Sequence, residues 1–278
     1  MVLLLSSSAA FICIVIVAFI LFTLNANTET GFDWGGTPFV GPVAGNEIPG
    51  NAIVAKTLND FKGVDNSKVF PQNKGHPEIT NITDKGNGVF EFYLRHRGSW
   101  YDGDRDLAWN RQGYDKSRAE VTQLGSKAQQ VGETWEYGTT FKVDKDFSPA
   151  TGFCNVMQQF PMSWIQLMKI KGETITGSLM YAKTMNGFHP HASARNFTFR
   201  RNEWVSLVIR LKIDDNDGEC ALSVNGDEFK GVRGRVLKSD KSYGAKWGLY
   251  MSATKDVNGK PLGDSKVWHA NVWVRQVS

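Results

Sequence analysis

The sequence has few cysteines and little net charge, and both shortages exclude whole classes of protein. Three cysteines cannot hold together a small disulfide scaffold, and 278 residues are enough to bury a core without one. The 32 Lys and Arg residues stand against 28 Asp and Glu residues. The resulting net charge of +4 is too small and too dispersed for a protein that binds duplex nucleic acid. A different polyanionic ligand remains compatible with this charge.

Charged side chains are absent from the first 28 residues. Residues 9–22 are apolar throughout, and about 20 apolar residues suffice to cross a bilayer as a helix. No Lys or Arg precedes this run, and Leu24 occupies a position where a cleavage site prefers a small residue. We therefore expect residues 1–25 to be a signal anchor, with a cleaved signal peptide or a buried hydrophobic helix as alternatives. An anchor or a signal peptide places the rest of the chain outside the cytoplasm, membrane-tethered or secreted.

The rest of the chain has the composition of a linker followed by one β domain. Residues 26–50 are rich in Gly, Pro, Asn and Thr and have no period, which is typical of a linker. Within residues 51–278 the clearest strands are 134–143 and 204–213, where apolar and polar side chains alternate. No segment of comparable helical period follows the N-terminal apolar run. The pattern predicts an all-β antiparallel sandwich or jelly roll.

A turn and the last strand fit this architecture. Asn225-Gly226 predicts a type I′ hairpin, because both central positions of that turn need a positive φ. Alternation over residues 267–274 predicts that one side of the strand carries Trp268, Ala270, Val272 and Val274.

The two cysteines outside the apolar run, Cys154 and Cys220, both lie in strand-like segments. In an oxidising compartment they can form one disulfide. Two separate buried thiols are the alternative, and the sequence leaves both open.

Three predicted strands place polar groups on one face and apolar groups on the other. In residues 117–122, Arg118 and Glu120 share a face, where the carboxylate can hold the guanidinium ready for an anionic ligand. A surface salt bridge is the alternative. Residues 153–160 form an apolar strand that contains three amides, and alternation puts Asn155 and Gln159 on one face.

In the third strand, residues 246–252, Lys246 and Tyr250 share a face and Gly248 between them leaves room for a ligand. Polar packing within the fold and a solvated sheet face are the alternatives for these strands.

Histidine supplies further candidates. His96 shares a face with apolar residues, so packing is its default role, and the pair His189-Pro190-His191 resembles a metal clip. No Cys, Asp or Glu lies close enough in sequence to complete such a clip. We therefore predict no metal site.

In their order these segments resemble the β-jelly-roll polysaccharide lyases. An R-x-E strand precedes a W-x-Y-G strand, a strand ending in Gln, a Trp-led strand, an L-S-V-N-G hairpin and a K-x-G-x-Y strand. The similarity covers residues 88–274. It is closest to the glucuronan-lyase and heparin-lyase-like groups, and it shares the ordered Arg, Gln and Tyr segments of the alginate lyases. The resemblance implies a concanavalin-like monomer that binds an anionic polysaccharide, requires no cofactor and can accommodate a structural calcium ion.

The implied reaction is β-elimination of a uronic-acid-containing polysaccharide. Arg118 and Gln158 match the residues that bind and neutralise the uronate carboxylate. Tyr250 matches the Tyr that accepts the C5 proton, donates one to the leaving O4 oxygen, or does both. Glu120 would orient Arg118, and Lys246 would lower the pKa of Tyr250 or bind the charge of the polymer.

The sequence departs from the family pattern at the catalytic base. Alginate lyases place a His two residues after the Gln, where this chain has Phe160 after Gln158. His96 and His191 are the remaining candidates. Alternation also favours Gln159 as the amide on the ligand face, whereas the resemblance favours Gln158, and a β-bulge would reconcile the two.

Two other functions compete with the lyase. A lectin-like sandwich would use the same polar face to bind carbohydrate without cleaving it. A laminarinase-like glycoside hydrolase would need paired carboxylates, commonly as E-x-D-x-E on one strand, and no such triplet occurs in the sequence. A purely structural surface protein is the remaining alternative.

Overall fold

The structure is a computed structural model of the 278-residue chain. It describes residues 47–61, 80–94, 116–124, 129–159, 163–182, 191–236, 244–252, 256–260 and 263–278. The chain divides into units of residues 1–42 and 43–278, and every described residue belongs to the second unit. No helix in these described ranges is long and apolar enough to span a membrane. The expected anchor at residues 1–25 and the candidate His96 both lie outside them.

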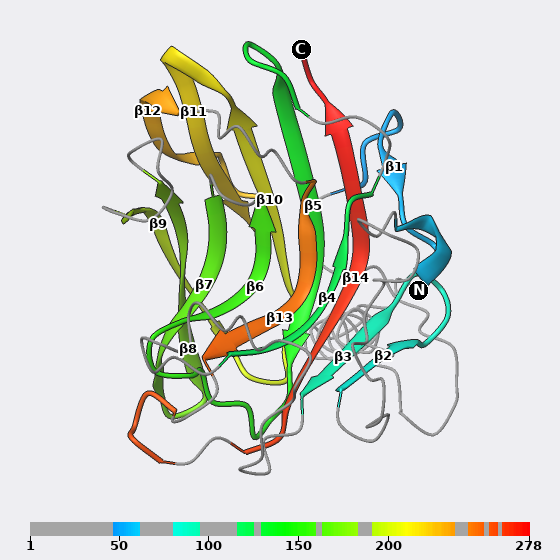
Figure 1. Ribbon diagram of the computed structural model, residues 1–278, viewed down its shortest axis with the longest axis vertical. Helices are drawn as coiled ribbons and strands as arrows, with labels where there is room; N and C mark the ends of the chain where they lie inside the picture. Colours follow the sequence, from blue (N-terminus) through cyan, green and yellow to red (C-terminus); the bar gives the residue numbers. More distant parts are fainter. Residues whose placement is uncertain are drawn as a thin grey trace, which may run out of the picture. The chain divides into compact units, whose positions relative to one another are not determined.

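The described residues form a sandwich of two antiparallel sheets (Figure 1). The eight-stranded sheet has the order β12-β11-β10-β5-β14-β3-β2, and β1 pairs with β14 beside this path. Its strands are β1 (Ile53–Val54), β2 (Thr80–Asp84), β3 (Phe90–Leu94), β5 (Thr134–Val143), β10 (Val205–Lys212), β11 (Asp214–Val224), β12 (Lys230–Val236) and β14 (Ser265–Gln276). A short 3-10 helix, η1 (Leu58–Asp60), follows β1.

The six-stranded sheet has the order β4-β13-β6-β7-β8-β9. Its strands are β4 (Lys116–Thr122), β6 (Cys154–Gln159), β7 (Ser163–Lys171), β8 (Thr174–Ala182), β9 (His191–Arg200) and β13 (Lys246–Ser252). The three strands that carry the polar motifs, β4, β13 and β6, are therefore neighbours although they come from distant parts of the chain.

The core lies between the two sheets and is built from alternate residues of each strand. In β10, Leu207, Ile209 and Leu211 are fully buried, as the alternation of the sequence predicts. On the facing sheet, Trp247 and Leu249 of β13 are also fully buried. The predicted all-β sandwich is thus confirmed in the described residues.

The predicted hairpin between β11 and β12 is also confirmed. Asn225 and Gly226 have φ angles of 50° and 81°, which are the two positive values that the turn requires. The backbone N–H of Asp227 donates to the carbonyl oxygen of Val224 at 3.1 Å.

The prediction of a single face along β14 is wrong. Val272 lies in the core between the sheets, whereas Trp268 and Ala270 pack with Val89 in a separate cluster. The register of β14 against β5 shifts between Ala270 and Trp273. Asn271, in this interval, has φ +49°. A bulge inserts an extra residue and so reverses the faces of all later side chains.

Cys154 and Cys220 are free thiols, which settles the alternative that the sequence leaves open. Both side chains are fully buried, one in each sheet. Burial raises the pKa of both thiols to about 12, so they are protonated at neutral pH.

Candidate functional site

Tyr250 stands at the centre of the polar motifs. In the register of the six-stranded sheet, Tyr250 of β13 lies opposite Arg118 of β4 and opposite Asn155 of β6. Four positions before Tyr250 on β13, Lys246 lies opposite Gln158 of β6. Directly opposed residues of neighbouring strands present their side chains on the same face. The face that carries Tyr250, Lys246, Asn155 and Gln158 is called the motif face below.

Two register shifts decide which amides of β6 reach the motif face. The pairing of β6 with β13 and with β7 is irregular next to Asn155, and Val156 pairs with neither strand. As a result Asn155 and Gln158, three residues apart, both lie opposite residues of the motif face. Gln159 follows Gln158 directly and is 2% exposed, so it lies on the other face, paired with Ser163. The grouping of Gln159 with Asn155 is therefore wrong, and the bulge is the cause.

Glu120 and Gln158 join the two strands that flank β13. The amide Nε2 of Gln158 donates a hydrogen bond to Oε1 of Glu120, and both side chains are buried. Glu120 lies opposite Gly248 of β13. The absence of a side chain at Gly248 allows this contact to pass over the strand between them. The contact fixes a carboxylate within the motif face, two residues along β4 from Arg118.

Asn155 is buried with an unsatisfied atom beside Tyr250. The side chain is 7% exposed, and its Oδ1 has no hydrogen-bond partner among the described residues. A buried carbonyl oxygen without a donor costs free energy, so such an atom marks a place where a ligand donor is favourable. The ring of Phe153 packs against Tyr250, with 4.8 Å between centroids. This contact restricts the phenol on one side.

β7 extends the motif face with two residues that the sequence analysis missed. Trp164 lies opposite Gln158, and Gln166 lies opposite Asn155. The indole Nε1 of Trp164 donates to Oε1 of Gln166 at 3.3 Å. Both side chains are half-buried, while Ile165 between them is fully buried. The alternation of residues 163–167 is the signal that would have found them.

Of the two histidine candidates for the base, the described structure places His191 alone, by its strand. His191 begins β9, which is four strands from β13 in the sheet, about 19 Å at the usual strand spacing. His96 lies outside the described residues. Arg118 is described by its place in β4, opposite Tyr250.

No three His, Cys, Asp or Glu side chains gather at one point within the described ranges. A structural calcium ion therefore stays a prediction.

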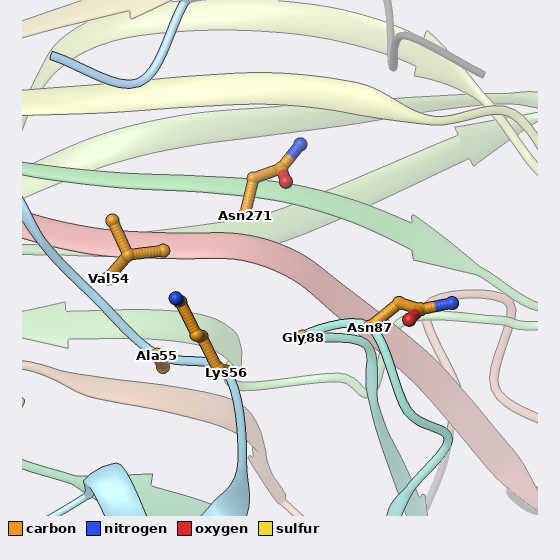
Figure 2. A pocket seen from close by; sticks show the side chains of 6 residues that line it. All are labelled: Val54, Ala55, Lys56, Asn87, Gly88 and Asn271. Atoms are coloured by element: carbon orange, nitrogen blue, oxygen red, sulfur yellow. The ribbon is translucent and has the colours of Figure 1, made fainter. Parts of the chain in front are cut away.

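A pocket of about 510 Å³ is lined by no residue of β4, β6 or β13 (Figure 2). It is formed by the end of β1, the turn before β3 and the bulge of β14, and contains none of the residues that the sequence analysis selected. Its lining residues are Val54, Ala55, Lys56, Asn87, Gly88 and Asn271. The pocket and the motif face are therefore separate features of the domain.

Comparison with solved structures defines the fold class. The chain is similar to a β-glucanase catalytic domain of glycoside hydrolase family 131 from Podospora anserina, with a TM-score of 0.50 and 12% identity over 81% of this chain and 92% of that chain. At this identity the likeness shows the fold alone, a β-jelly-roll sandwich.

Two further solved structures give lower scores. A family 7 alginate lyase, A1-II′, in complex with substrate has a TM-score of 0.46 and 15% identity, covering 72% of this chain and 82% of that one. Alginate lyase Aly36B has a TM-score of 0.45 and 8% identity, covering 82% and 97%. No family model matches the sequence, and the search of curated proteins found no match.

Proposed function

We propose that this protein is an exported polysaccharide lyase that cleaves a uronic-acid-containing polysaccharide by β-elimination. One observation carries the proposal: the phenol of Tyr250 lies between the register positions of Arg118 and Asn155, on a face that continues with Gln158 and Lys246. A phenol, a guanidinium and amides are the groups that this reaction needs around one sugar acid. Export rests on the apolar segment at residues 1–25 and stays a prediction.

The carboxylate of the substrate must be neutralised before its C5 proton can leave. The charge that develops on proton removal spreads onto this carboxylate, so hydrogen-bond donors there stabilise the transition state. In our proposal Arg118 and Asn155 supply these donors on either side of Tyr250. The unsatisfied Oδ1 of Asn155 accepts from a sugar hydroxyl. Gln158 holds Glu120 with one N–H and offers the other to the substrate.

Tyr250 then serves as both base and acid. Its phenolate oxygen takes the C5 proton, the C5–H electron pair forms the C4=C5 double bond, and the C4–O4 bond breaks. The proton passes from Tyr250 to O4 of the leaving sugar, so the enzyme returns to its starting state. A phenol is ionised with difficulty at neutral pH. A neighbouring guanidinium favours the phenolate, and in our proposal Arg118, whose register position lies opposite Tyr250, supplies it.

In our proposal Lys246 serves a different sugar from Tyr250. It lies four positions away along β13, about 13 Å between Cα atoms at the rise of a β-strand. We therefore assign Lys246 to the carboxylate of a neighbouring sugar rather than to the pKa of Tyr250. The half-buried ring of Trp164 offers an apolar surface for a sugar ring on the other side of Gln158.

The glycoside-hydrolase alternative meets a specific difficulty on this sheet. Hydrolases of both stereochemical classes ordinarily use two carboxyl groups that flank the scissile bond. The six strands of this sheet contain one carboxylate, Glu120, and its Oε1 is bonded to Gln158. The described part of the motif face therefore favours a lyase over a hydrolase.

The test incubates the full chain with glucuronan, alginate and heparin and follows ultraviolet absorbance of the new double bond conjugated to the carboxylate. We expect turnover by the wild type and a loss of about 1,000-fold or more in Tyr250→Phe, with polymer binding and folding retained. Full turnover by Tyr250→Phe would refute the assignment. New reducing ends without absorbance would identify a hydrolase, and binding without either signal would identify a lectin.

A further inference from the structure

A buried histidine lies directly behind the motif face. His269 belongs to β14 of the eight-stranded sheet and is fully buried between the sheets. Its Nε2 lies 3.3 Å from the carbonyl oxygen of Gly248 in β13 of the opposite sheet. Its Nδ1 lies 3.0 Å from Oγ1 of Thr139 in β5. The imidazole thus links the two sheets at the strand that carries Tyr250.

The bonding partners fix the tautomer of His269. A carbonyl oxygen can only accept, so Nε2 carries the proton and donates it to Gly248. Nδ1 is then the acceptor, and the hydroxyl of Thr139 donates to it. Burial lowers the pKa of His269 to about 3, so the ring is neutral at physiological pH. The rings of Phe92 and Phe141, with centroids at 5.4 and 6.0 Å, hold its plane.

Gly248 is the irregular point of β13. The register against β6 shifts between Trp247 and Tyr250, an interval that contains Gly248. Its φ of +138° is one that side-chain-bearing residues rarely adopt, and a Cβ there would lie 2.2 Å from the carbonyl oxygen of Ala119. Where a bulge interrupts the ladder, a backbone carbonyl needs a donor from elsewhere. His269 supplies that donor from the opposite sheet.

This bulge sets the spacing of the motif face. On β13 Lys246 and Tyr250 are four positions apart, whereas on β6 their partners Gln158 and Asn155 are three positions apart. A regular ladder would pair Tyr250 with a different residue of β6 and would move an amide to the other face. The group that stabilises the carbonyl of Gly248 therefore stabilises the pairing of Tyr250 with Asn155.

We propose that His269 is a positioning residue for the lyase reaction: its neutral imidazole holds the Gly248 carbonyl and so maintains the bulge that aligns Tyr250 with Asn155. The proposal rests on the proposed function for its kinetic consequence but not for its structural one. His269 does not contact the substrate, and it acts only through the backbone of β13.

The test compares three substitutions in the full chain. His269→Phe keeps a planar ring but removes the donor, and His269→Gln keeps an N–H that can reach Gly248. Val274→Ala is the matched control, because Val274 is a buried core residue of the same strand whose register partner is Tyr137 of β5. Misplacement of a catalytic group by about 1 Å costs about 100-fold in rate.

We expect His269→Phe to lose about 100-fold in kcat while KM stays within a factor of about three, since the sugar-binding groups remain. His269→Gln should restore kcat to within about tenfold of the wild type, and Val274→Ala should keep both constants despite a lower melting temperature. A His269→Phe variant with the kcat of Val274→Ala would overturn the proposal.

A second readout separates this proposal from the proposed function. Amide hydrogen exchange at Leu249 and Tyr250 should accelerate at least about tenfold in His269→Phe relative to Val274→Ala, whether or not any polymer is cleaved. Equal exchange rates in the two variants contradict the positioning role. If His269→Phe does not fold, Thr139→Val takes its place, because it removes the donor to Nδ1 of His269. We expect faster exchange at the same two amides in Thr139→Val. Unchanged exchange at both amides would count against the proposal.

Discussion

The outer faces of the two sheets differ in whether their buried polar side chains have hydrogen-bond or ion-pair partners. On the eight-stranded sheet, Glu136 is almost fully buried and pairs with Arg210 and Arg275 on the neighbouring strands, at 2.7 and 2.6 Å. Further along the same strands, the indole of Trp268 donates to Glu91 at 2.8 Å, and the ammonium of Lys142 lies 4.9 Å from the centre of the Trp268 ring. These groups satisfy one another.

On the motif face of the six-stranded sheet, by contrast, a buried polar atom has no partner among the described residues. Glu120 and Gln158 contact each other, but Oδ1 of Asn155 is buried without a partner among the described residues. A face that satisfies its own polar atoms contributes to stability, and a face that leaves one unsatisfied carries a free-energy cost that a ligand can offset. In our proposal stability resides on one outer face and recognition on the other.

The largest expected effect concerns His269 in the layer between the two faces. Its pKa is about 3 in the folded chain and about 6.5 when unfolded, so below pH 6.5 the unfolded chain binds the extra proton. The free energy of unfolding should therefore fall as pH drops from 6.5 to 3, by on the order of 5 kcal/mol in total. Urea unfolding of the wild type and of His269→Gln across this range measures the difference. Parallel pH profiles for the two proteins would contradict the prediction.

The next prediction concerns the outer face of the eight-stranded sheet, where the polar groups pair with one another. Glu136→Ala leaves two guanidinium groups without their shared carboxylate and should cost about 3 kcal/mol of unfolding free energy. Polymer cleavage should be unchanged at a temperature where the variant is folded. Glu173→Ala is the control, because the Glu173 side chain is more than half exposed and its pair with Arg201 contributes less than about 1 kcal/mol. A loss of cleavage by folded Glu136→Ala would break the division of roles between the faces.

On the motif face, a substitution should leave stability intact and reduce activity. Asn155→Leu removes a buried unsatisfied carbonyl, so the free energy of unfolding should stay level or rise by about 1 kcal/mol. The same change removes a donor to the substrate carboxylate, so kcat/KM should fall at least about tenfold. Chemical denaturation and steady-state kinetics on one preparation of Asn155→Leu test the change in unfolding free energy and the change in activity. If stability and activity fall together, Asn155 belongs to the structure rather than to the site.

The last comparison concerns the two bulges, and its Asn271→Gly variant has the smallest expected effect. Asn271 in β14 has φ +49° and nothing in the described structure requires a missing side chain there, so Asn271→Gly should change stability by only a few tenths of a kcal/mol. At Gly248 a Cβ would overlap the backbone of β4. Gly248→Asn should therefore disrupt the motif face. Thermal melts of the two variants, with cleavage assays, show whether only the β13 bulge supports function.

Particular residues show what the sequence predicts well. The strands of β5 and β13 have the bounds expected from alternation at residues 134–143 and 246–252. Tyr250 and Lys246 share a face as expected, because β13 alternates regularly against β4. Local period determines which side of a regular strand a residue occupies, and no knowledge of the partner strands is needed.

The same reasoning fails wherever a bulge intervenes. Gln159 and Val272 were placed on the wrong faces, since one extra residue in β6 and one in β14 reverse the alternation. A bulge arises from the pairing of strands that are distant in sequence, so no local pattern contains it. The role of His269 has the same origin, because its partner Gly248 comes from the opposite sheet.

By itself the sequence determined the all-β class, the alternating strands and the chemical groups available for recognition. These features follow from side-chain period and from turn residues, which act over a few positions. Only the tertiary structure decided that β4, β13 and β6 are neighbours, that Gln158 rather than Gln159 joins Asn155 on the motif face, and that a buried imidazole lies behind them. The physical reason is that register between distant strands is fixed by the packing of the whole core.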